Sequence, residues 1–216
     1  MMSYANPGMN MFKVIRMAKR PEGASAAQFR EEWTRAQRAI TPPPSRTVVS
    51  LATGEVALGG QVPIFDGMAA LYYESLDKAR AACAALKDAA AVVCDEHLMS
   101  QKPSPEIRIK IIRTVYRRRD LSHPQFKDYW LKNHSKLEDR VIAESPVQRI
   151  VATFAVTEPG TDPAFDGMVE LYFANVADIR AMFAGPIPAM MRKDEESFVQ
   201  MDAPAVRLVA EEFGAG

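Results

Sequence analysis

Residues 63–81 read PIFDGMAALYYESLDKARA, and residues 163–181 read PAFDGMVELYFANVADIRA. These two stretches match at a constant spacing of 100 residues, and an earlier series of matches has a spacing of 97. The earlier series pairs KVIR at 13–16 with KIIR at 110–113, and it also pairs Trp33 with Trp130. The chain of 216 residues therefore contains two similar halves, and this internal repeat decides the expected fold.

Each half predicts the same series of elements. A strand rich in β-branched residues comes first, and a helix follows it after a serine that can cap the helix N-terminus, Ser25 or Ser122. Two more strands, a second helix and a final strand complete each half. The expected strands and second helices are 12–18, 47–52, 68–73 and 76–86 in the first half, and 109–116, 149–156, 168–173 and 176–183 in the second.

The resulting order, β-α-β-β-α-β, is the ferredoxin-like plan. The final strand of the second half, 205–210, aligns with the beginning of that same half, which predicts one long strand at 106–117 shared by both halves. Both faces of this stretch carry apolar side chains, so two sheets should face each other.

The expected fold is therefore α+β, with two tandem ferredoxin-like units (residues 11–106 and 107–213) that form an intramolecular dimeric α+β barrel behind a flexible N-terminus (1–10). The pairs Asp95-Glu96 and Asp194-Glu195 are expected at equivalent places near the end of each unit. Trp33 and Trp130 should both be buried between helix and sheet.

Charge and composition exclude several classes of partner. Lys+Arg and Asp+Glu both number 27, so no general electrostatic attraction to nucleic acid or to a membrane surface is expected. No apolar run approaches the roughly 18 residues of a membrane span. The two cysteines and an N-terminus without a signal-peptide pattern favour the cytoplasm. A homodimer of the whole chain remains open.

Three stretches of the second half resemble a known family. They are FKDYWLKNHSKL at 126–137, PAFDGMVELYF at 163–173 and DEESFV at 194–199, and they resemble the EthD-like family of the dimeric α+β barrel superfamily. The first half matches less well, since its FREEWTRAQ at 29–37 has no histidine. The resemblance implies a small-molecule pocket between sheet and helices, without metal or organic cofactor. Relatives include decarboxylases, cyclases, isomerases and cofactor-free monooxygenases.

His134 is the first candidate for catalysis. A helical wheel places it near Trp130 at the edge of the apolar face, and histidine is suited to proton transfer near neutral pH. A core histidine bonded to backbone fits the same spacing. The equivalent residue of the first half is Gln37, which cannot act as a base. We therefore expect one functional pocket, in the second half.

Other candidates lie on the neighbouring strands. Arg113 could bind a carboxylate and Tyr116 could donate to an enolate, although strand alternation puts them on opposite faces, and Arg113 also fits a structural ion pair. Glu170, where the first half has Ala70, is a secondary acid–base candidate. The expected substrate-binding residues are Trp130, Tyr129, Tyr172 and Asn133, although core packing with a satisfied hydroxyl is the usual role of a strand tyrosine such as Tyr172.

These features predict a cofactor-free acid–base enzyme, an isomerase, lyase (decarboxylase) or cyclase, acting on a small aromatic-derived or polyene carboxylic acid. A cofactor-independent monooxygenase of a phenolic substrate and a non-catalytic protein that binds small molecules or forms oligomers are the alternatives. The spacing of His97, His123 and His134 does not fit a metal site, so none is expected.

Overall fold

The computed structural model describes residues 11–54, 64–86, 90–103, 106–158 and 160–214, and the N-terminal segment expected to be flexible, residues 1–10, lies outside them. The first half contains β1 (Phe12–Ala18), α1 (Ala26–Arg38), β2 (Arg46–Ala52), β3 (Gly67–Tyr73), α2 (Leu76–Leu86) and β4 (Val92–Gln101). The second half contains β5 (Ile109–Val115), α3 (His123–Tyr129), η2 (Trp130–His134), α4 (Ser135–Glu144), β6 (Arg149–Ala155), β7 (Gly167–Phe173), α5 (Val176–Ala184), α6 (Ile187–Glu195) and β8 (Arg207–Gly214).

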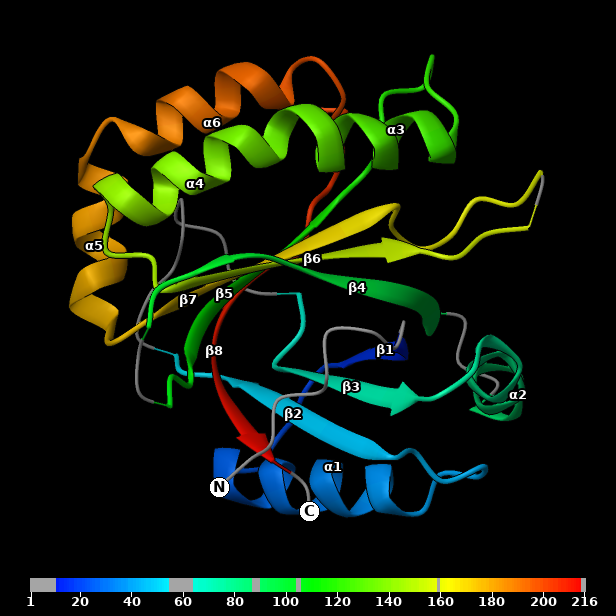
Figure 1. The fold of residues 1–216 in the computed structure, drawn as a ribbon. Helices are drawn as coiled ribbons and strands as arrows, with labels where there is room; N and C mark the ends of the chain where they lie inside the picture. The colour runs from blue at the N-terminus through cyan, green and yellow to red at the C-terminus, as the bar shows by residue number, and fades with distance from the viewer. Residues whose placement is uncertain (1–10, 55–63, 87–89, 104–105, 159, 215–216) are drawn as a thin grey trace.

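The eight strands form one closed antiparallel barrel. Their order around the barrel is β1-β3-β2-β8-β5-β7-β6-β4, so β2-β3-β1-β4 and β6-β7-β5-β8 are two runs with the same internal order. The runs meet where β4 pairs with β6 and where β8 pairs with β2. Helices α4, α5 and α6 cover one side of the barrel, and α1 lies on the opposite side (Figure 1). The α+β class and the barrel are thus confirmed.

Local sequence explains how the first helix of each half is placed. Ser25 and Ser122 each form a reciprocal capping box with the glutamine three residues later, which satisfies exposed backbone N–H groups. In each of these helices a phenylalanine packs against the glycine that begins a strand. A Cβ at Gly67 would lie 3.0 Å from Phe29, and one at Gly167 would lie 3.0 Å from Phe126. The glycines of the two Asp-Gly pairs therefore permit close packing of helix on sheet.

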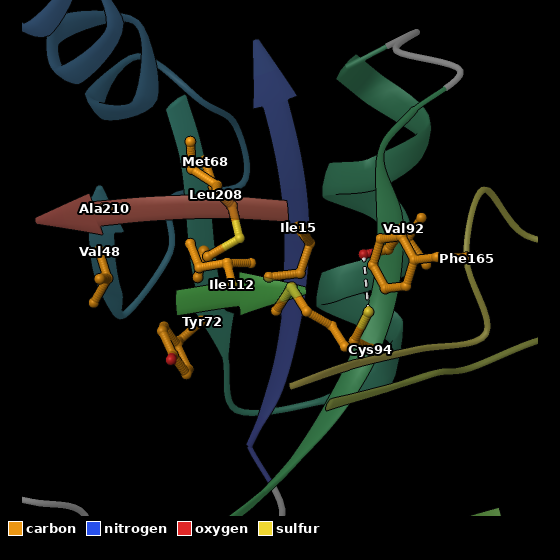
Figure 2. Packing of buried hydrophobic residues seen from close by; sticks show 12 residues of the cluster. Ile15, Val48, Met68, Tyr72, Val92, Cys94, Ile112, Phe165, Leu208 and Ala210 are labelled. Carbon is orange, nitrogen blue, oxygen red and sulfur yellow. Dashed lines mark hydrogen bonds between the residues drawn. The ribbon is translucent and has the colours of Figure 1, made fainter. Parts of the chain in front are cut away.

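Part of the barrel interior is apolar. Its side chains form a single buried cluster contributed by seven strands, with Ile15, Ile112 and Leu208 meeting near the middle (Figure 2). Burial of this surface stabilises the closed form, at roughly 25 cal/mol per Å² of apolar area.

The other part of the interior contains buried charges. The Nζ atoms of Lys13 (β1) and Lys110 (β5) both contact the carboxylate of Glu170 (β7), at 3.2 and 2.5 Å. Glu96 accepts from Lys13 and the Tyr72 hydroxyl, and Glu212 accepts from Lys110 and the Tyr172 hydroxyl. Burial by itself would raise the pKa of Glu170, but Lys110 and Lys13 outweigh it and hold that pKa well below its ordinary value.

Three expectations were wrong. No strand shared between the halves exists at 106–117, because β5 begins at Ile109 and the first half ends with its own strand, β4. The pair Asp95-Glu96 lies on β4 whereas Asp194-Glu195 lies on α6, a helix that the second half inserts before β8. Trp130 is buried, but Trp33 is only half-buried, with Arg16 stacked 5.1 Å from its ring.

Removal of the Glu170 carboxylate tests the importance of the buried charges. Glu170→Ala reproduces the alanine of the first half but leaves Lys13 and Lys110 without their common partner inside the barrel. We expect a loss of about 3–5 kcal/mol in the free energy of unfolding, measured by urea denaturation at neutral pH. Glu144→Ala, which removes an exposed partner of Arg140, should leave stability unchanged. A loss below about 1 kcal/mol in Glu170→Ala would show that the network is dispensable.

Candidate active site

The candidate site is built on one long helix that changes its winding. Helices α3 and α4 continue each other through η2, a π-helical turn at Trp130–His134 (Figure 1). Such turns are rare and are frequently found at functional sites. The turn presents both Trp130 and His134 to the interior, where each is 2% exposed. The His134 ring packs against Trp130 and Phe198, with ring centroids 5.7 and 5.0 Å apart.

A carboxylate fixes the orientation of this imidazole. Nδ1 of His134 lies 2.7 Å from Oδ2 of Asp194, at the end of α6, and the Tyr129 hydroxyl donates to Oδ1 of the same carboxylate at 3.1 Å. Because a carboxylate accepts hydrogen bonds, Nδ1 carries the hydrogen that faces Asp194, and in the neutral tautomer of this ring Nε2 carries the lone pair. Among the described residues, Nε2 has no hydrogen-bond partner.

His134 lines a cavity of about 490 Å³ between the helix layer and the outer face of the barrel. The floor comes from β5, β6, β7 and β8, and the walls come from η2, α4, α5 and α6. Most of the lining is apolar and includes Ile111, Leu171, Met182, Phe183 and Met191; the polar lining residues are Arg113, His134, Glu138, Arg180, Arg192, Glu195 and Arg207. A mostly apolar cavity with a few converging polar groups is typical of a small-molecule site.

The polar lining carries an excess of positive charge. Nη1 of Arg113 forms an ion pair with Oε1 of Glu195 at 2.6 Å. Burial lowers the pKa of Arg207, the nearby Arg113 and Arg192 lower it further, and Glu195 opposes them. All four side chains line the same cavity. The expected ion pair of Arg113 is therefore present, and the arginine also faces the cavity.

Glu138 is a polar lining residue that the sequence analysis missed. It lies on α4 one turn after His134, its side chain is buried, and Oε1 accepts a hydrogen bond from Nε1 of Trp130 at 3.1 Å. Burial raises the pKa of Glu138 to about 7, against the opposing effect of the Trp130 hydrogen bond. The four-residue spacing from His134 was its only sequence signal, and charged residues at that spacing are common on exposed helix faces.

The remaining sequence candidates lie elsewhere. Glu170 and Tyr172 belong to the charged network inside the barrel, and Tyr116 packs against the apolar cluster there and donates to the carbonyl of Ala164. Arg113 and Tyr116 thus lie on opposite faces of the sheet, as predicted. Asn133 is exposed. The structure therefore brings together His134, Trp130 and Arg113, and Asp194 connects Tyr129 to this group. It separates three other candidates from them: Tyr116, Glu170 and Tyr172.

The first half is arranged differently at the equivalent place. Gln37 is buried there, accepts from Nη1 of Arg16 at 2.9 Å and donates to the carbonyl of Trp33. A larger groove of about 1030 Å³ lies beside α1, lined by four arginines of that half, but its described lining includes no histidine. A basic group suited to proton transfer is therefore found in the second-half cavity.

The described residues contain no group of three or more His, Cys, Asp or Glu side chains that could hold a metal ion. Within the same ranges, each helix is too short or too polar to cross a membrane.

The pH dependence of stability tests the buried state of Glu138. Because its pKa is higher in the folded chain than in the unfolded chain, where it is about 4.3, the folded state binds the extra proton and stability falls as pH rises from about 4.5 to about 7. Glu138→Gln removes this dependence. The wild type should lose about 3 kcal/mol more than the variant between pH 4.5 and pH 7.5 in urea unfolding. Parallel curves for the two proteins would contradict the assignment.

Comparison with known proteins agrees with this architecture. Residues 118–202 match the EthD domain, whereas none of the curated proteins matches the chain. The fold is similar to an anthrone oxidase-like protein (TM-score 0.67, 10% identity, covering 97% of this chain and 95% of that one). It is also similar to a chlorite dismutase variant from Candidatus Nitrospira defluvii (TM-score 0.52, 8% identity, 93% and 91% covered). At such low identities these structures establish the fold. The matched residues contain the η2 turn, His134, Glu138 and Asp194, so the second half of the chain contains an EthD domain and the candidate site lies within it.

Proposed function

We propose that the chain is an enzyme that transfers protons on a small carboxylic acid of largely apolar character, in the cavity of the second half. The observation that carries this proposal is that His134, which lines that cavity, is paired with Asp194 behind it. A positioned histidine beside a largely apolar cavity, with a ring nitrogen that can accept a proton, is the arrangement that general-base catalysis requires.

His134 is the base in this proposal. Asp194 holds the tautomer in which Nε2 can accept a proton, and it stabilises the imidazolium that then forms. The hydrogen bond from Tyr129 keeps the carboxylate in place. The aromatic rings of Trp130 and Phe198 limit rotation of the imidazole and exclude water from it.

The arginines select the substrate class. The positive charges in this part of the cavity outnumber the negative charge of Glu195, since they come from Arg113, Arg192 and Arg207. A substrate carboxylate would neutralise this excess of positive charge and accept charge-assisted hydrogen bonds. Methionine and phenylalanine side chains of α5 and α6 would then cover the apolar part of the molecule. This arrangement favours an aromatic-derived or polyene acid with an acidic C–H bond near His134.

We infer in addition that the two halves are copies of one ferredoxin-like unit and that only the second retained a working site. The matched sequence stretches and the identical strand order of the two runs support this inference. Gln37 and Arg16 satisfy each other where the second half has His134 and Arg113. A fused pair needs one working site, so the first half can serve as scaffold.

A cofactor-independent oxygenase is the second candidate, and the structural similarity to an anthrone oxidase-like protein is the observation that favours it. Such a reaction would also begin with removal of a proton by His134. Consumption of oxygen during turnover would distinguish this outcome from isomerisation or lysis.

Proton exchange tests the role of His134. In D₂O, the wild type should exchange the methylene protons of a keto acid such as 4-oxo-5-phenylpentanoic acid, followed by NMR. His134→Gln should lower the exchange rate by about 10²-fold or more, the usual contribution of a positioned base. Gln37→Ala, the matched change in the first half, should leave the rate per folded molecule unchanged. Equal losses in both variants, or no loss in His134→Gln, would exclude a single site with this base.

A further inference from the structure

Glu138 has one oxygen that the fold uses and one that it leaves unpaired. Oε1 accepts from the indole N–H of Trp130, while Oε2 is buried without a hydrogen-bond partner among the described residues. The residue is 1% exposed. An unpaired buried oxygen is destabilising, so its retention beside a cavity points to a partner that arrives with the ligand.

The chemical state of this carboxyl differs from that of a surface glutamate. Its raised pKa, about 7, leaves a large fraction protonated at neutral pH. The indole N–H needs an acceptor at Oε1, so the proton is carried by Oε2, the oxygen without a partner. Glu138 can therefore present an O–H donor to a ligand in the cavity while His134 presents an acceptor.

Trp130 connects the two groups. Its ring packs edge-on against the imidazole, and its N–H holds the carboxyl, so one rigid indole fixes both. His134 and Glu138 are four residues apart, and side chains at this spacing are neighbours on a helix, with Cβ atoms about 5–6 Å apart. Both line the same cavity. They can flank a short carbon segment, with one group at each end.

We propose that Glu138 is the catalytic acid that completes a proton shift begun by His134, which makes the cavity an isomerase site for β,γ-unsaturated keto acids. This inference rests on the proposed function, since it requires His134 to act as the base, and it adds the reaction type and the second proton-transfer group.

The reaction balances without an oxidant or a further reactant. The C–H bond between the carbonyl and the double bond breaks, its proton goes to Nε2 of His134, and the electron pair spreads over a dienolate. A new C–H bond then forms at the far end of the dienolate with the proton from Oε2 of Glu138. The double bond is now conjugated with the carbonyl. Transfer of one proton from His134 to Glu138 through water restores the starting state.

The test uses the full chain and 4-oxohept-6-enoic acid as the probe. In D₂O, NMR follows exchange at the methylene between carbonyl and alkene, which needs only His134. Ultraviolet absorbance follows formation of the conjugated 4-oxohept-5-enoic acid, which needs both residues. The variants are H134Q, E138Q and, as a matched control on the same helix, E144Q, whose carboxylate is exposed and paired with Arg140. Gln at 138 retains an oxygen that can accept from Trp130.

We expect E138Q to retain exchange and to lose isomerisation by about 10²-fold or more, H134Q to lose both, and E144Q to lose neither. In the wild type, the rate of isomerisation should fall as pH rises above neutrality, because Glu138 then loses the proton that it donates. The rate of exchange should not fall. This comparison needs no variant. Exchange without isomerisation in the wild type, or isomerisation by E138Q at the wild-type rate, would overturn the role of Glu138 and leave the base intact. Neither exchange nor isomerisation in the wild type would overturn the proposed function, and this inference with it.

Discussion

Two lysine ammonium groups lie inside the barrel, one from each half of the chain, and the Glu170 carboxylate contacts both. Burial of two cations requires such a partner, because an unpaired charge in the interior is strongly destabilising. The same contacts join β1, β5 and β7, which belong to both runs of strands. Closure of the barrel and satisfaction of these charges therefore depend on each other, and together they fix the outer face on which the helices pack.

The candidate site depends on that outer face. A strand alternates its side chains, so β5 directs Lys110 and Ile112 into the barrel and Arg113 toward the helices. The glycine that begins β7 lets Phe126 and Trp130 approach closely, and this contact sets the height of the helix above the sheet. The cavity is the space left between this helix, α5, α6 and the strands. Its polar groups are therefore held by elements with little freedom to move, as catalysis by proton transfer requires.

Much of the fold could be predicted from the sequence. The repeat and the apolar alternation located β1 and α2 with their observed bounds, because these are local patterns. The last strand of the first half was misplaced, because the match of Asp95-Glu96 with Asp194-Glu195 concealed the insertion of α6. His134 and Arg113 were found at the site, but Glu170 was interpreted as an acid–base group. Its true environment depends on lysines from strands distant in sequence, which no local pattern reveals.

The environment of Glu138 could not be predicted from the local sequence either. A glutamate on a charged helix is normally solvated, whereas Glu138 is buried and bonded to Trp130 of the π-helical turn. Winding changes of this kind have no reliable sequence signature. The difference between the halves could be predicted from the sequence, because Gln37 of the first half aligns with His134 of the second.

The central claim is that a single cavity, between β5, β7 and helices α4 to α6, binds a carboxylic acid with its reactive carbon beside His134. The most direct test is a crystal structure of the full chain with 4-oxoheptanoic acid, a saturated keto acid that has no double bond to shift. The claim predicts electron density for the ligand in this cavity alone. Its carboxylate should lie at Arg113 and Arg207, and C5, the methylene carbon next to the ketone, should face Nε2 of His134. Binding in the groove beside α1, or in the cavity with the carboxylate directed away from the arginines, would contradict it.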